Sequence, residues 1–172
     1  STDSGVVLEI DTNGNIIYSF KVDVYNQTRV KYIDIANDGN LVVIGRTNVI
    51  GAGFQGIFIS KRNKNGTELN RSVYDTGYRE DDYDNNNYSY PLGVGKLSNG
   101  NYVIVNSYHE RDCLLLEIDQ NLNTKSNKIY GDGTHNELPY GLQLFSNGDI
   151  LISGETQAYI NGQYKHDVFS IR

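Results

Sequence analysis

The chain has 172 residues, of which 38% are hydrophobic and 21% charged, a balance typical of a soluble globular domain with one core. Its formal net charge is −6 and its Lys and Arg residues are not clustered, so neither nucleic acid nor an anionic membrane surface is expected as a partner. No apolar run approaches the length of a membrane span, so membrane insertion is not expected either.

Taken in chain order, the first predicted strand is an apolar segment that returns three times: "SGVVLEID" (4–11), "GIFISKRN" (56–63), "DCLLLEID" (112–119) and "DVFSIR" (167–172). A more polar strand follows the first three copies: "NIIYSFKV" (15–22), "TELNRSVY" (67–74) and "TKSNKIYG" (124–131). A third strand type leads into a polar turn: "VKYIDIANDG" (30–39), "YPLGVGKLSNG" (90–100) and "PYGLQLFSNG" (139–148). The fourth leaves that turn, in "NDGNLVVIGRT" (37–47), "SNGNYVIVNSY" (98–108) and "SNGDILISGET" (146–156).

The turns between the third and fourth strand types have a physical explanation. Asn-Gly and Asp-Gly supply the positive φ angles that tight hairpins require, so Gly39, Gly100 and Gly148 are predicted to close equivalent hairpins. The runs between turns are β-branched and aromatic, and no segment has the apolar period of a helix. The sequence therefore predicts an all-β protein.

Repetition of four strands about every 54 residues predicts a particular architecture. The repeat units span approximately 4–55, 56–111 and 112–166, with 167–172 starting a fourth, inside one domain over 1–172. Tandem four-stranded antiparallel units with a period above 40 residues are typical of a β-propeller. We expect a partial propeller, an array of about three four-stranded antiparallel blades with the polar strand at the outer edge. A β-sandwich is the alternative.

The units resemble the secreted β-propeller repeats of bacteria, which are roughly 55 residues long. Their signature is a "DG-G-hydrophobic-G" hairpin followed by a "D-hydrophobic-K-D-G" strand and turn. The matching stretches are "NDGNLVVIGRT" with "GIFISKRNKNG", and "SNGDILISGET" with "DVFSIR". The sequence departs from the pattern in having no Trp, and in placing Glu9 and Glu117 where a basic residue is common. The resemblance implies a bacterial protein that is secreted or located at the cell surface.

The number of repeats bears on the assembly. Propellers close with four or more blades, and this chain holds about three. We therefore expect the chain to be part of a longer propeller. A homodimer that completes a ring and an open, curved array are the alternatives.

The longest interruption of the repeat, residues 74–91, is rich in Asp, Asn and Tyr. Asp82, Asp84 and Asn86 alternate like the first ligands of a calcium loop, although Asn87 and Gly93 stand where such a loop has Gly and a bidentate acid. Calcium is the one cofactor that this pattern suggests, and a solvated acidic loop is the alternative. No other cofactor is expected.

Tyrosines placed among Asn and Asp suggest a recognition surface for a carbohydrate or protein ligand, because tyrosine offers a flat apolar ring and a hydroxyl. A second connection, "YGDGTHNELPY" (130–140), adds polar groups. Packing of tyrosines in place of Trp and Phe is the alternative. The predicted ligand-binding residues are Tyr78, Tyr83, Tyr88, Tyr90, His135, Asn136 and Tyr140.

No catalytic residues are predicted. The sequence has no G-x-S-x-G elbow and no P-loop, and Cys113 lies in an apolar strand pattern typical of a buried residue. We therefore expect a non-catalytic binding or scaffold module of a secreted or cell-surface protein. The alternatives are a fragment of a propeller-fold glycoside hydrolase or lyase, and a structural spacer without a ligand.

Overall fold

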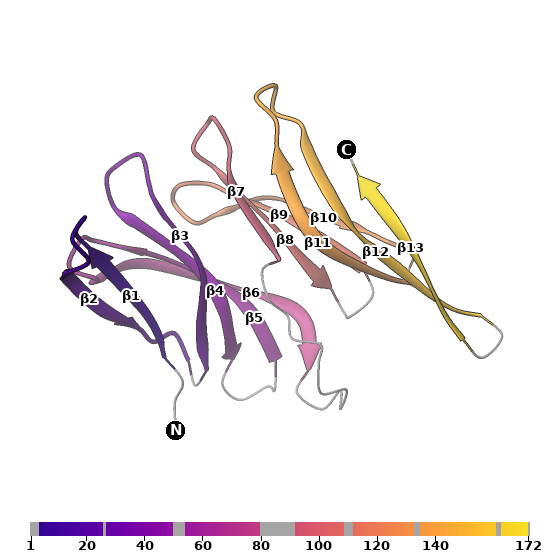
Figure 1. Cartoon of the computed structure of the whole chain (residues 1–172), viewed down its shortest axis with the longest axis horizontal. Coiled ribbons are helices and arrows are strands. Elements are labelled where there is room, and N and C mark those ends of the chain that lie inside the picture. The colour runs from indigo at the N-terminus through magenta and orange to yellow at the C-terminus, as the bar shows by residue number, and fades with distance from the viewer. Residues whose placement is uncertain are drawn as a thin grey trace.

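The computed structural model describes residues 4–25, 27–49, 54–79, 92–108, 112–132, 135–160 and 163–171. Within these ranges the protein consists of 13 β-strands and contains no helix, so the all-β prediction is confirmed. The strands form four antiparallel sheets, none of which closes into a barrel (Figure 1). The described part of the chain accordingly offers no helix long and apolar enough to cross a membrane.

Hydrogen-bonded neighbours follow chain order in every sheet. The first sheet pairs β1 (Gly5–Ile10) with β2 (Ile16–Val22). The second contains β3 (Thr28–Ile35), β4 (Leu41–Val49), β5 (Phe54–Arg62) and β6 (Glu68–Arg79). The third contains β7 (Gly93–Lys96), β8 (Tyr102–Tyr108), β9 (Asp112–Ile118) and β10 (Thr124–Tyr130). The fourth contains β11 (Asn136–Leu144), β12 (Ile150–Ile160) and β13 (Gln163–Ile171).

The sheets and the sequence repeats are out of phase by two strands. The repeat predicted over 4–55 contributes β1 and β2 to one sheet and β3 and β4 to the next. The second, third and fourth sheets are therefore each built from the end of one sequence unit and the beginning of the following one. The polar strands β6 and β10 lie at sheet edges, as predicted for strands whose Lys, Asn and Ser side chains discourage further pairing.

The four sheets stack face to face. Successive side chains of a strand point to opposite faces, so a strand of an inner sheet can pack against the sheet before it and the sheet after it. Alternate residues of β4 and β5 pack against the third sheet, in a buried cluster of Val42, Ile44, Ile57, Ile59, Tyr102, Ile104, Leu116 and Ile118. Val43 and Phe58, between them in sequence, pack against the first sheet. Val105 and Cys113 of the third sheet pack in turn against Ile152 of the fourth. The inner sheets are thus covered on both faces, and Figure 1 shows the succession from indigo to yellow.

One edge of the stack carries all the tight turns of the described chain, and we call it the turn edge. Gly39, Gly100 and Gly148 have φ values of 79°, 85° and 90°, which confirms the predicted hairpins. The turns joining β1 to β2, β5 to β6 and β9 to β10 lie at the same edge. Because consecutive strands are antiparallel, β2, β4, β6, β8, β10 and β12 all end at the opposite edge, which we call the loop edge (Figure 1).

A glycine in the fourth strand type is explained by an aromatic ring on the adjacent strand. Gly45 pairs with Phe58, and Gly154 pairs with Phe169. A Cβ atom at Gly45 would lie 2.7 Å from the Phe58 ring, and one at Gly154 would lie 2.6 Å from the Phe169 ring. In the third sheet the corresponding pair is Asn106 with Leu114, without the ring. Each of these glycines therefore leaves room for the phenylalanine ring on the adjacent strand.

Candidate functional site

Buried polar side chains are concentrated near the loop edge. Among the described residues nine polar or charged side chains are buried, and seven of them lie at strand ends next to this edge: Thr28, Arg46, Thr47, Gln55, Thr76, Asn106 and Ser107. Thr28 and Thr76 have structural roles, since the Thr28 hydroxyl accepts a hydrogen bond from the Val24 amide at 3.0 Å and the Thr76 hydroxyl donates to the Gln55 carbonyl at 2.8 Å. The loop edge is therefore the polar end of the stack.

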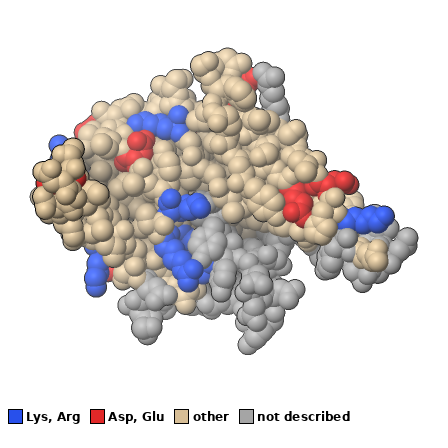
Figure 2. All heavy atoms as spheres, in the orientation of Figure 1, with Lys and Arg blue, Asp and Glu red and all other residues tan. Residues whose placement is uncertain are grey.

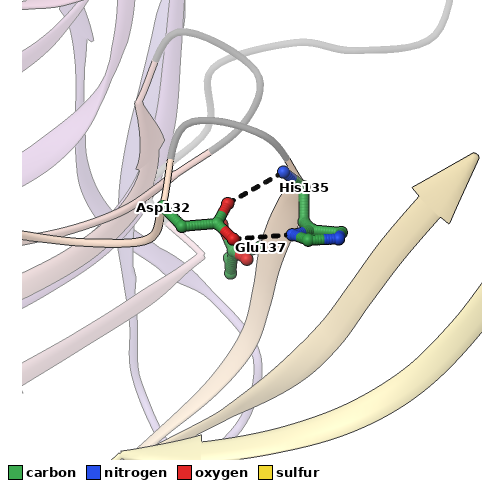
Figure 3. Close-up of side chains that lie close together, drawn as sticks. All are labelled: Asp132, His135 and Glu137. Carbon is green, nitrogen blue, oxygen red and sulfur yellow. Dashed lines mark hydrogen bonds and ion pairs between the residues drawn. The ribbon is translucent and has the colours of Figure 1, made fainter.

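The connection between the third and fourth sheets brings three titratable side chains together at this edge: Asp132, His135 and Glu137 (Figure 3). Asp132 Oδ1 accepts a hydrogen bond from the backbone amide of His135 at 3.0 Å, and Asp132 Oδ2 lies 2.7 Å from His135 Nδ1. Glu137 is the second residue of β11, where strand pairing with Thr156 fixes its backbone. The local fold thus holds an imidazole beside two carboxylates.

Glu137 is the member of this cluster with perturbed electrostatics. Burial raises the pKa of the Glu137 carboxyl, and the negative charges of Asp132 and Asp112 raise it further. Its Oε2 atom is buried and has no hydrogen-bond partner among the described residues. A Cβ atom at Gly131 would lie 2.7 Å from Glu137 Oε2 and 2.1 Å from Asp112 Oδ1. Any side chain at this position would therefore clash with the two carboxylates.

The cluster has the donor atoms to bind a cation or the polar groups of a ligand. One oxygen or nitrogen from each of the three residues lies within 4.8 Å of the others. An imidazole with two carboxylates suits Zn²⁺ or a similar transition metal, whereas Ca²⁺ prefers oxygen ligands alone. The signal in the sequence was Asp132 three residues before the histidine and Glu137 two residues after it.

The residues predicted to bind a ligand are distributed over several parts of the fold. His135 belongs to the cluster, and Asn136 is the first residue of β11, opposite Gln157. Tyr140 lies in the middle of β11 and is 59% exposed. Tyr83, Tyr88 and Tyr90, and the predicted calcium ligands Asp82, Asp84 and Asn86, lie outside the described residues.

Four tyrosines near turn-rich segments lie within strands. The structure places them within strands β6, β11, β12 and β13, at Tyr78, Tyr140, Tyr159 and Tyr164. The reason is strand length. The hairpin β12–β13 continues in register to the pair Ile160 and Gln163, and β6 runs for 12 residues. Turn-rich composition near these tyrosines does not stop the pairing.

A second polar group lies on the outer face of the fourth sheet, around a pocket of 380 Å³. Glu155 Oε2 accepts a hydrogen bond from the Tyr140 hydroxyl at 3.1 Å, and Glu155 Oε1 accepts one from Gln157 and contacts His166 Nδ1. The hydrogen bond with His166 lowers the pKa of the Glu155 carboxyl, and the one from Gln157 lowers it further. Val168 lines the same pocket. No local sequence pattern indicates this group, because its members meet only through strand pairing.

Charged side chains elsewhere are dispersed. On the face shown in Figure 2, described Lys and Arg residues form separate small groups, and most of the coloured surface is uncharged.

No protein-family model matches the chain, and no curated protein matches it. Among solved structures, it is similar to the crystal structure of a protein of unknown function from Bacteroides caccae, with a TM-score of 0.50 and 15% sequence identity. The similarity covers 93% of this chain and 53% of that one, so the chain spans about half the length of its structural neighbour. At this identity the likeness concerns the fold alone.

Proposed function

We propose that the chain is a run of β-propeller-type blades that acts as a non-catalytic binding module, recognising a carbohydrate or protein at its loop edge. The blade assignment is supported by the face-to-face stacking of up-and-down antiparallel sheets whose strands follow chain order. A secreted or cell-surface location belongs to the same proposal and is supported by the repeat motifs.

The proposed binding function rests on the contrast between the two edges of the stack. The turn edge is built from short Asn- and Asp-containing turns whose side chains mainly cap their own backbone. The Asp11 and Asp119 carboxylates, for example, accept hydrogen bonds from amides two and four residues later. The loop edge holds the Asp132–His135–Glu137 cluster and most of the buried polar side chains. Recognition groups on connections that a rigid β-scaffold positions are the usual arrangement of a binding face.

The cluster suits recognition because it is polar and preorganised. His135 is held from two sides by Asp132, through its backbone amide and its imidazole. Glu137 and Asp132 offer carboxylate oxygens that can accept hydrogen bonds from sugar hydroxyls or from backbone amides of a protein. Asn136 lies between His135 and Glu137 in sequence and adds an amide.

A glycan array tests the proposal directly. The 172-residue chain and a His135→Ala/Asn136→Ala variant are compared on arrayed glycans. A Thr12→Ala/Lys64→Ala variant, altered at two exposed positions of the turn edge, is the matched control. We expect the first variant to lose at least about tenfold in affinity, which corresponds to about 1.4 kcal/mol, and the control to bind like the unaltered chain.

A Tyr83→Ala/Tyr88→Ala variant extends the test to the tyrosine-rich segment. Binding that survives the His135/Asn136 and Tyr83/Tyr88 changes alike would refute the assignment of the ligand face. Release of new reducing ends from the bound glycans would refute the non-catalytic assignment and favour the glycoside hydrolase or lyase alternative.

A further inference from the structure

The outer face of the first sheet, which we call the leading face, is apolar and exposed. Val6, Leu8 and Ile10 alternate along β1, and they are 55%, 55% and 60% exposed. Ile16 and Ile17 of the paired strand β2 are 63% and 59% exposed. Val6, Leu8 and Ile10 share one face of the hairpin with Ile16, which pairs with Ile10, and these four side chains form the kind of contiguous apolar surface that marks an interaction site.

The internal repeats show what covers such a surface inside the stack. The residues of β9 that correspond to Leu8 and Ile10 are Leu116 and Ile118, which are 2% and 0% exposed. Both pack against the preceding sheet, in the cluster that contains Ile57 of β5. The repeat therefore uses these positions to bury one sheet against the one before it.

The other half of this contact lies at the opposite end of the chain, on the outer face of the fourth sheet, which we call the trailing face. Val168 of β13 corresponds to Ile57 in the repeat. Ile57 is 0% exposed and belongs to the same buried cluster as Leu116 and Ile118, whereas Val168 is 89% exposed. The two partners of one internal interface are thus both present and both uncovered, one at each end of the stack.

We propose that a second copy of the chain docks head to tail on the leading face, with its trailing face continuing the stack. Val168 of one copy then joins Leu8 and Ile10 of the next in one apolar cluster, as Ile57 shares a buried cluster with Leu116 and Ile118 within the chain. Such an interface is heterologous, and it closes a ring or extends an array according to the rotation between sheets. The interface is independent of the ligand proposed for the loop edge.

The polar pocket on the trailing face fits this assignment. Glu155 lies in the strand position that Arg46 occupies in the second sheet, and Arg46 is 1% exposed between two stacked sheets. Covering Glu155 would leave its carboxylate hydrogen-bonded to Tyr140 and Gln157 and in contact with His166. Buried polar groups need hydrogen-bond partners, and this carboxylate already has them. Burying it therefore costs less than burying an unpaired charge.

Two complementary variants test the orientation as well as the association. The mass of the 172-residue chain is measured by size-exclusion chromatography with light scattering from roughly 1 μM to roughly 100 μM, a range that covers interfaces of moderate affinity. We expect at least twice the chain mass. Leu8→Lys and Val168→Glu should each give the mass of one chain, because each destroys one half of the same interface. Circular dichroism checks that both variants remain folded.

Mixing the two variants provides the decisive measurement. The Leu8→Lys chain keeps an intact trailing face and the Val168→Glu chain keeps an intact leading face, so the mixture should form a one-to-one complex. Leu69→Lys, at a 53% exposed leucine on the inner sheet strand β6, is the matched control and should associate like the unaltered chain. The proposal is overturned by a single-chain mass for the unaltered protein at the highest concentration. It is equally overturned if Val168→Glu still associates, if the mixture stays monomeric, or if Leu69→Lys dissociates the assembly.

Discussion

Leu122 combines a strained backbone with an inter-sheet contact, and replacing it gives a test of the stacking. Its φ is 69°, in the region that glycine occupies at the corresponding positions of two other turns, with φ values of 86° at Gly14 and 82° at Gly66. Yet its side chain is 2% exposed and belongs to the cluster between the second and third sheets. Its carbonyl accepts hydrogen bonds from the Ser72 hydroxyl at 3.0 Å and the Tyr74 hydroxyl at 2.8 Å.

Two substitutions separate the packing of Leu122 from its strain. Leu122→Ala removes most of the buried side chain and keeps the unfavourable φ, so it should lower the free energy of unfolding by about 2–5 kcal/mol. Leu122→Gly removes the same side chain but relieves a backbone cost of about 1–2 kcal/mol. We therefore expect the glycine variant to be more stable than the alanine variant by about 1 kcal/mol. At an ordinary strand position glycine is the less stable of the two, by about 0.5–1 kcal/mol.

The free energies of unfolding are measured by urea denaturation, followed by circular dichroism. Gly14→Ala is the control for strain alone, because a Cβ atom there meets nothing within 4 Å at a φ of 86°. It should cost about 1 kcal/mol. An alanine variant at 122 that is as stable as the glycine variant, or more so, would refute the argument from strain. A loss below about 1 kcal/mol for both would refute the docking of this turn between the sheets.

Three further predictions concern single positions. Burial raises the pKa of the Cys113 thiol to about 12, so it should not react with Ellman's reagent at pH 8 until the chain is unfolded; rapid reaction of the native protein would contradict its placement. A hydrogen bond from Lys61 lowers the pKa of Asp38 from 3.8 to about 2, so this pair stabilises the fold above pH 4 and loses that effect as the pH falls toward 2. In a Lys61→Met variant, carboxyl NMR titration should find the Asp38 pKa raised toward its ordinary value, with the hydrogen bond from the Asn40 amide still lowering it; an unchanged pKa would disprove the pairing. Gly154→Ala should cost about 1–3 kcal/mol because its Cβ would lie 2.3 Å from the Leu138 carbonyl, and a neutral effect in urea denaturation would refute that close approach.

The sequence was sufficient to predict the features that depend on neighbouring residues. The hairpins at Gly39, Gly100 and Gly148 follow from the backbone preferences of Asn-Gly and Asp-Gly, and the polar composition of β6 and β10 predicted their edge positions. The phase of the sheets could not be predicted in the same way. A repeat of four strands has the same period whichever strand begins the sheet. The phase depends on which strands pair with each other at the loop edge: β4 pairs with β5, whereas β2 and β3 lie in different sheets.

The candidate site was predicted only in part, for a related reason. His135 was expected among the ligand-binding residues, but its contacts with Asp132 and Glu137 depend on the path of the chain between the third and fourth sheets. Glu155 and His166 are brought together by the pairing of β12 with β13, 11 residues apart in sequence, which local patterns do not encode.

One strand position shows how the stack combines stability with polar chemistry. On the face of β4 that carries Val42 and Ile44, the next residue toward the loop edge is Arg46, and the corresponding residues in the other sheets are Ser107 and Glu155. On this face of β4 the turn-edge half of the contact is therefore apolar and buries the sheet against the next one, whereas the position toward the loop edge is polar in all three copies. Because burial of apolar area supplies most of the stabilisation, the polar half is free to vary between copies without separating the sheets. This division allows a second copy to continue the stack through Leu8 and Val168 while the loop edge, with Asp132 and His135, stays open to a ligand.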